Sequence, residues 1–144
     1  MRSFDMQMKE TLPERRMMAM HETFNSYISF YLKPSRIHIF MDVLRGIGSP
    51  PRICFKIDPD GKRLLVTPYY KVDFKSHAVP RDVYRGNDCM EISSLKLCKI
   101  IANLHGLDAE RSYRIPGFVD VDDKIAVFDL TRATEIRRDS QSSR

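Results

Sequence analysis

Residues 36–68 read RIHIFMDVLRGIGSPPRICFKIDPDGKRLLVTP, and this stretch decides the fold. It begins with a short strand, RIHIF, in which apolar side chains alternate with polar ones. Residues 42–47 predict a short helix that ends at Gly48, because glycine readily adopts the left-handed conformation that stops a helix. Pro50 and Pro51 prevent that helix from continuing. The first half of the stretch therefore predicts a strand followed by a short helix.

The second half of this stretch predicts a β-hairpin. Ile53, Phe55 and Ile57 alternate with other residues at the period of a strand. The next four residues, DPDG at 58–61, are typical of a tight turn, because proline presets φ and glycine supplies a positive φ. Residues 62–68 then return as the paired strand. Together the two halves form one unit of strand, short helix and hairpin.

A weaker copy of this order of elements follows later in the chain. A short strand at 90–92 precedes a helix that Ser93 or Ser94 can cap. Gly106 ends this helix, and a second hairpin follows over 113–130. The helix carries four apolar side chains at helical spacing that we expect to face the core: Leu97, Ile100, Ile101 and Leu104. The two copies match at Gly48 with Gly106, Phe55 with Ile115, Lys62 with Lys124, and Leu65-Val66 with Val127-Phe128.

The chain is therefore expected to contain two units joined by a connector. The expected segments are an N-terminal arm, helical or disordered, over 1–25, a first unit over 26–70 that includes a strand at 26–32, a connector over 71–88, a second unit over 89–132, and a flexible tail over 133–144. A unit of this size has too little interior to fold alone, so we expect the two units to intertwine around one core. The expected fold class is α+β, mainly β.

The excess positive charge lies in the first 88 residues. The formal net charge is +5. Residues 1–36 hold six basic and four acidic side chains, residues 37–88 hold nine and six, and residues 89–144 hold nine of each. A basic first half suits contact with phosphates, although an ordinary solvated surface with a small excess of lysine and arginine explains the charge equally well.

The sequence offers no pattern of a catalytic, metal or cofactor site. Cys54, Cys89 and Cys98 include no CxxC pair, so we expect reduced thiols rather than a disulfide framework or a zinc site. A phosphate-binding glycine loop and a GxSxG elbow are also absent from the sequence, so no enzyme activity and no cofactor is expected. The longest apolar runs are far shorter than the ~20 residues that cross a bilayer. We expect a cytoplasmic protein without a membrane partner.

The first unit resembles the AbrB/SpoVT/MraZ-like swapped-hairpin family. The resemblance rests on Arg36-Ile37-His38-Ile39, then Asp42-Val43-Leu44-Arg45, then Ile47-Gly48 and the hairpin over 53–66. It implies a transcription regulator in which two units, within one chain or between two chains, intertwine into a pseudo-twofold barrel. It also implies that basic residues of the first strand and helix contact DNA. The family usually has proline after its first strand, where this chain has Phe40.

On this resemblance, the expected DNA contacts lie in the first unit. Arg36 and Arg45 can bind phosphate or guanine through the guanidinium fork. Arg52, Lys62 and Arg63 are expected to contact the DNA backbone. The second unit has only Lys96 and Lys99 near the matching positions, so it is expected mainly to complete the core. The expected partners are double-stranded DNA and a second copy of the chain.

A second hypothesis is a protein–protein interaction module with the same fold, antitoxin-like or the partner of a mobile element. Aromatic side chains in 27–31 and at Tyr69 and Tyr70 would then anchor another protein. Binding of duplex DNA at low salt distinguishes the two hypotheses, because only the first requires it.

Overall fold

The computed structural model describes residues 24–137. Within this part of the chain, nine strands belong to one sheet. The strands are β1 (Ser26–Tyr31), β2 (Arg36–Phe40), β3 (Arg52–Ile57), β4 (Arg63–Tyr69), β5 (His77–Ala78), β6 (Cys89–Ser93), β7 (Ser112–Asp120), β8 (Ile125–Asp129) and β9 (Thr134–Glu135). The helices are α2 (Met41–Gly46) and α3 (Leu95–His105), and the 3-10 turns are η1 (Arg81–Tyr84) and η2 (Leu130–Arg132).

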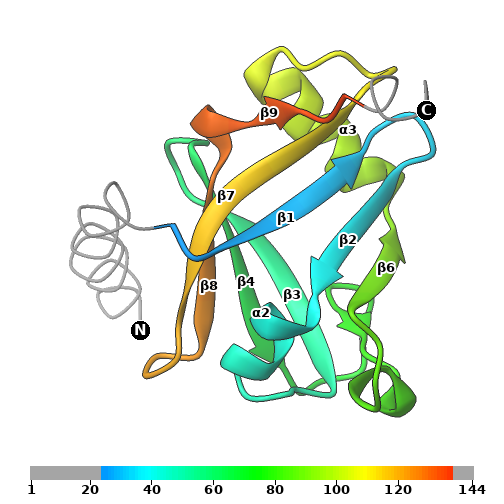
Figure 1. The fold of residues 1–144 in the computed structure, drawn as a ribbon, viewed down its shortest axis with the longest axis vertical. Helices are drawn as coiled ribbons and strands as arrows, with labels where there is room; N and C mark the ends of the chain where they lie inside the picture. Colours follow the sequence, from blue (N-terminus) through cyan, green and yellow to red (C-terminus); the bar gives the residue numbers. More distant parts are fainter. Residues whose placement is uncertain (1–23, 138–144) are drawn as a thin grey trace.

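The sheet is antiparallel throughout and forms a nearly closed barrel (Figure 1). Its order is β5-β3-β4-β8-β7-β1-β2-β6, with β9 paired to β7. Along this order, the pair β3-β4 and the pair β1-β2 of the first expected unit are separated by β8-β7 of the second, so neither unit has a sheet of its own. The mainly β fold class is confirmed.

Both expected hairpins are present. In the first, the Asp58 carboxylate accepts hydrogen bonds from the backbone N–H groups of Lys62 and Arg63, at 2.9 and 3.1 Å. These bonds close the turn between β3 and β4, in which Gly61 has a φ of 73°. The second hairpin, β7–β8, closes with Lys124 in the left-handed region at a φ of 56°. Local turn chemistry therefore sets the register of each hairpin.

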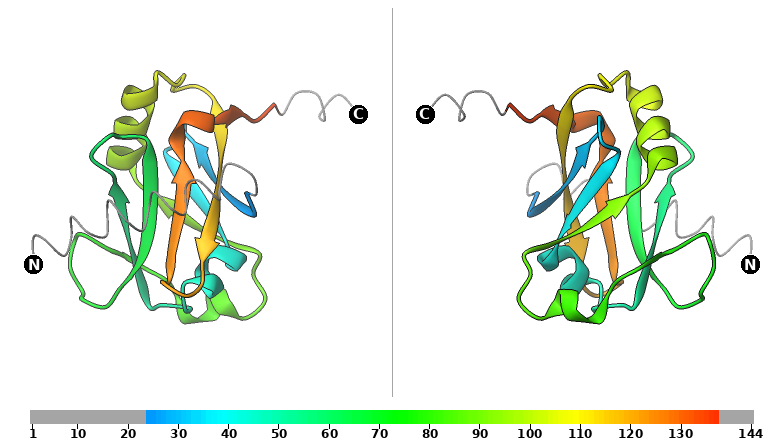
Figure 2. Two further views of the ribbon diagram at one scale, coloured as in Figure 1. Left: turned by 90° about the vertical axis from the view of Figure 1, so that its left-hand side faces the viewer. Right: turned by 90° about the vertical axis from the view of Figure 1, so that its right-hand side faces the viewer.

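The two helices occupy opposite ends of the barrel (Figure 2). Helix α2 begins directly after β2 and buries Met41, Val43 and Leu44. Helix α3 begins at Ser94, whose side chain accepts a hydrogen bond from the backbone of Leu97, and ends at Gly106 with a φ of 61°. The caps of α3 that the sequence indicated are therefore confirmed.

The core is formed by the inward side chains of the strands together with one face of each helix. Its largest fully buried side chains include Phe30 and Phe128. On α3, however, the buried residues are Cys98 and Ile101. Ile100 is 38% exposed and Leu104 is 51% exposed, so the expectation that both face the core is wrong. Helix α3 packs on the barrel through Cys98 and Ile101, with Leu97 and Ala102 partly buried beside them, so its buried face is rotated from the expected apolar stripe.

Two expected boundaries also change. Strand β9 pairs with β7, and the backbone N–H of Ile136 donates to the carbonyl of Ser112 at 2.8 Å, so the tail expected from residue 133 begins inside the sheet. The connector over 71–88 contains β5 and η1. The N-terminal arm expected over 1–25 lies almost wholly outside the described residues.

Candidate nucleic-acid interface

A surface groove lies where β1 begins and where β2 passes into α2. Its volume is about 790 Å³. The residues that line it come from β1, β2, α2, β7, β9 and the segment that precedes β6. Its basic side chains are Arg45, on α2, and Arg114, on β7, so we call this site the Arg45–Arg114 groove.

Two aromatic rings meet on the wall of the groove, and one of them stacks with Arg114. The rings of Tyr27 and Phe40 meet edge to face, with centroids 4.9 Å apart. The guanidinium carbon of Arg114 lies 4.3 Å from the centroid of the Tyr27 ring, within the range of a cation–π contact. Strand pairing fixes this arrangement, because Tyr27 of β1 is opposite Pro116 of β7, and Arg114 is two pairs further along, on the same side of the sheet.

The second arginine reaches the groove from α2. Arg45 is exposed, and its guanidinium donates a long hydrogen bond of 3.4 Å to the backbone carbonyl of Tyr84. Among residues 24–137, neither Arg45 nor Arg114 has a carboxylate within ion-pair distance. Both guanidinium groups therefore keep their charge available for a ligand.

The groove also contains acceptors and amides. Asp42 and Asp88 line it together with Asn25 and Asn87. Guanidinium groups bind phosphate, aromatic faces stack on bases, and amide or carboxylate groups bind the hydrogen-bonding edges of bases. The two aspartates balance the two arginines, so this groove favours a ligand with both anionic and hydrogen-bonding groups over a simple anion.

Arg36 lies on the same outer side of β2 as Phe40, which lines the groove. Arg36, His38 and Phe40 alternate with the buried Ile37 and Ile39. At a rise of about 3.3 Å per residue, Arg36 is roughly 13 Å along the strand from Phe40.

A carboxylate neutralises the charge of Arg36. Its guanidinium is 2.6 Å from the carboxylate of Glu91 on β6. The second oxygen of that carboxylate lies 3.1 Å from Nε2 of His38. The structure thus places Arg36 and Arg45 on one side of the molecule, with Arg45 in the groove and Arg36 beyond it.

Arg52 holds a loop in place. This residue begins β3, and its Nε donates to the hydroxyl of Ser76 at 2.6 Å. Its Nη2 donates to the backbone carbonyls of Ser76 and Asp73, at 3.3 and 3.5 Å. The side chain therefore connects β3 to the loop between β4 and β5, away from the Arg45–Arg114 groove.

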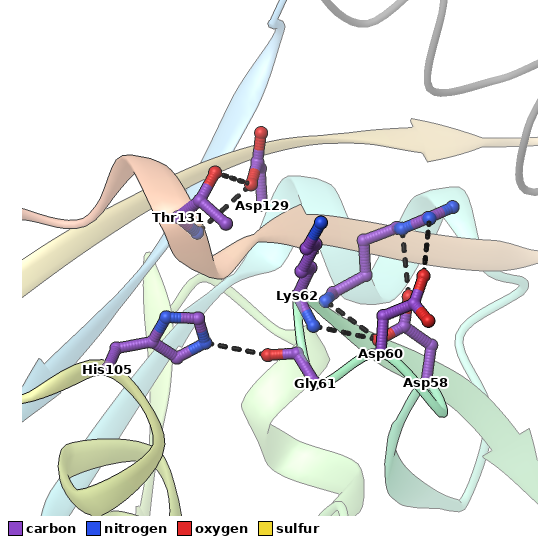
Figure 3. Close-up of polar contacts among 8 residues, drawn as sticks. Asp58, Asp60, Gly61, Lys62, His105, Asp129 and Thr131 are labelled. Carbon is purple, nitrogen blue, oxygen red and sulfur yellow. Dashed lines mark hydrogen bonds and ion pairs between the residues drawn. The ribbon is translucent and has the colours of Figure 1, made fainter.

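Lys62 and Arg63 lie at the other end of the β3–β4 hairpin from Arg52. The turn that carries Lys62 contacts His105 at the end of α3 (Figure 3). The Arg63 side chain is 16% exposed, and its Nε is 2.8 Å from the Asp58 carboxylate. Lys62 is exposed on the turn. His105, at the end of α3, donates from Nε2 to the carbonyl of Gly61 at 2.6 Å. Of the five expected DNA contacts, the structure brings Arg45 alone into the groove.

The sequence argument did not single out Arg114. Polar Arg114 alternates with the apolar residues on either side of it, Tyr113 and Ile115. This pattern is typical of a strand and predicts that the Arg114 side chain faces outward. The neighbours Tyr27 and Phe40 come from strands far away in the sequence, and only the β1–β7 and β1–β2 pairings bring them together.

Within residues 24–137, no cluster of three or more histidine, cysteine, aspartate or glutamate side chains has the arrangement of a metal site. The described helices are all too short or too polar to cross a membrane. Comparison of the chain with protein-family models, with curated proteins and with solved structures found no match.

Proposed function

We propose that this protein binds DNA as a transcription regulator or accessory protein of the AbrB-like type. The observation that carries the proposal is the Arg45–Arg114 groove, where two guanidinium groups that have no carboxylate partner within residues 24–137 share one surface with a pair of aromatic rings. In this proposal the two arginines contact phosphates, and the rings and amides of the groove contact sugars and bases.

The strand pairing supports a pseudo-twofold arrangement of two units. Strand β2 pairs antiparallel with β6, and β4 pairs antiparallel with β8, so equivalent strands of the two units are neighbours. The sequence match of Leu65 with Val127 coincides with a direct pairing of these two residues. The proposed twofold axis passes through this pair and through the pair His38 and Glu91, and it relates the first unit to the second. The same proposed axis relates β5 to β1.

The proposed contact surface is not duplicated. The guanidinium group of Arg45 on α2 has no counterpart on α3, whose cations are Lys96 and Lys99. In this proposal the first unit therefore supplies the main contact with DNA, and the second unit adds Arg114 from β7. This division accounts for the neutral charge of residues 89–144.

Equilibrium titration of a fluorescein-labelled duplex of random sequence tests the proposal. The wild-type protein is expected to bind at low salt and to lose affinity steeply as salt rises. Loss of two charge-assisted contacts in Arg45→Ala with Arg114→Ala should weaken binding at least 10-fold.

The matched control is Lys96→Ala with Lys99→Ala, which removes the same charge from exposed positions of α3. This control should bind within about twofold of the wild type. Equal affinities for the two double variants would contradict the groove as the DNA site. Absence of duplex binding by the wild type at low salt, together with copurification of another protein, would favour the protein-interaction module instead.

A further inference from the structure

The loop between β4 and β5 exposes three large apolar side chains. Tyr70 is 69% exposed, Val72 is 85% exposed and Phe74 is 94% exposed. A folded surface rarely presents three such residues within five positions unless they contact a partner.

This loop is held in place by hydrogen bonds at its base. The Tyr69 hydroxyl donates to the carboxylate of Asp73 at 2.8 Å, and the backbone N–H of Lys75 donates to the other oxygen of that carboxylate at 2.9 Å. Ser76 is buried and accepts from Arg52 at 2.6 Å. The exposed side chains are therefore mounted on a fixed backbone, which lowers the entropy lost when they bind.

The charge that the loop presents is positive. The carboxylate of Asp73 is engaged by Tyr69 and by the Lys75 backbone, and the hydrogen bond from Tyr69 lowers the pKa of this carboxyl group. Lys71 and Lys75 are exposed, and within residues 24–137 neither has a carboxylate at ion-pair distance. Aromatic rings between lysines suit a polyanion that carries stacking surfaces.

One residue, Tyr84 of η1, is near both Arg45 of the groove and Tyr70 of the loop. Arg45 donates to the backbone carbonyl of Tyr84. The Tyr84 phenol is hydrogen-bonded to the carbonyl of Pro50 at 2.7 Å, and its pKa is raised by burial and, secondarily, by the nearby Tyr70. Tyr84 therefore connects Arg45 of the groove with Pro50, which precedes β3.

We propose that the loop over 70–75 stacks Phe74 on unpaired bases, with Lys71 and Lys75 on the adjoining phosphates. This inference rests on the proposed DNA binding and deepens it, since it assigns single-stranded or locally opened DNA as the preferred ligand. One base stacked on an aromatic side chain strengthens binding by at least about 5-fold.

A tryptophan reporter tests the stacking directly. The chain contains no tryptophan, so Phe74→Trp creates a single fluorophore at the tip of the loop. Addition of an oligothymidine strand should quench this fluorophore, and increasing salt should reverse the quenching. The matched reporter is Val121→Trp, on the β7–β8 turn, where the native side chain is 64% exposed; it should be quenched weakly or not at all.

Affinity measurements separate this inference from the proposed function. Wild-type protein should bind a 30-nucleotide strand, or a duplex with a central bubble, at least 5-fold more tightly than the intact duplex. Phe74→Ala should abolish that preference while leaving duplex affinity within about twofold. The Arg45→Ala with Arg114→Ala variant should weaken binding to all three ligands.

Equal affinity of the wild type for strand and duplex, or an unchanged preference in Phe74→Ala, would overturn the stacking role and leave DNA binding in the groove intact. Binding to none of the three ligands would overturn both. A blue shift of the Phe74→Trp fluorescence with phosphatidylserine vesicles, without any response to the oligonucleotide, would assign the loop to a lipid surface and contradict the proposal.

Discussion

The guanidinium of Arg114 lies over the ring of Tyr27, with its central carbon 4.3 Å from the ring centroid. This contact joins the second expected unit to the strand that begins the first. It positions one of the two groove arginines, because the Tyr27 ring is itself held edge to face by Phe40. The proposed DNA site is therefore built by the pairing of the two units and belongs to neither alone.

Arg52→Ala should destabilise the fold without acting through DNA. The side chain makes three hydrogen bonds to the loop between β4 and β5, and we expect a loss of roughly 1–2 kcal/mol in the free energy of unfolding. Urea denaturation measures this quantity. The comparison variant is Arg36→Ala, which removes an exposed ion pair and should cost less than about 1 kcal/mol. Equal losses in the two variants would contradict the anchoring role of Arg52.

Cys98 should resist thiol reagents in the folded protein. Burial raises its pKa to about 11, so at pH 8 only about one thiol in a thousand is the reactive thiolate. Cys89 is partly exposed, although burial also raises its pKa. Peptide mass spectrometry after brief iodoacetamide treatment should find Cys89 modified well before Cys98. Protein unfolded in urea should show similar labelling of both, and rapid native labelling of Cys98 would refute its burial.

Gly117→Ala should be strongly destabilising, because β7 and β8 approach too closely for a side chain. A Cβ at this position would clash with the carbonyl oxygen of Val127 and lie 2.6 Å from the Phe128 ring. We expect a loss of roughly 3 kcal/mol or more. Gly106→Ala is the control, since its Cβ meets nothing within 4 Å and only a φ of 61° opposes it; it should cost about 1–2 kcal/mol. A smaller loss for Gly117→Ala than for Gly106→Ala, by thermal or urea unfolding, would rule out this packing.

His77 should make the fold less stable in mild acid. Burial, and secondarily the charge of Arg52, lowers its pKa below the usual 6.5. The unfolded chain therefore binds the proton more tightly than the folded protein. The contribution of His77 is complete above the unfolded pKa and is lost as pH falls through the folded pKa. Wild-type protein should lose more unfolding free energy between pH 7.5 and 5 than His77→Gln does. Identical dependence of the unfolding free energy on pH in the two proteins would exclude this contribution of His77.

Local signals in the sequence predict much of this fold. The turn at 58–61 and the caps of α3 depend on neighbouring residues. The glycine, proline, aspartate and serine at those places were therefore sufficient to predict them. The two hairpins follow from alternation within short segments. These features need no knowledge of the rest of the chain.

Features that depend on distant partners could not be predicted in the same way. Ile100 and Leu104 have the helical spacing of core residues, yet α3 packs through Cys98 and Ile101. The pairing of β9 with β7 rests on only a few residue pairs, which a polar tail sequence does not reveal. Arg36 and Arg63 carry the charge expected of DNA contacts, but Glu91 and Asp58 partner them in the fold. Only the pairing of the strands determines which arginines keep their charge free.

The salt dependence of duplex binding tests the central claim most directly, because it counts phosphate contacts rather than total affinity. The slope of log K against log salt changes by about 0.9 for each phosphate contact on duplex DNA. If the guanidinium groups of Arg45 and Arg114 each contact a phosphate, the slope for Arg45→Ala with Arg114→Ala should be shallower by about 1.8, and the slope for Lys96→Ala with Lys99→Ala should equal that of the wild type. An unchanged slope in the groove variant, or an equal reduction in both variants, would contradict the Arg45–Arg114 groove as the DNA-binding site.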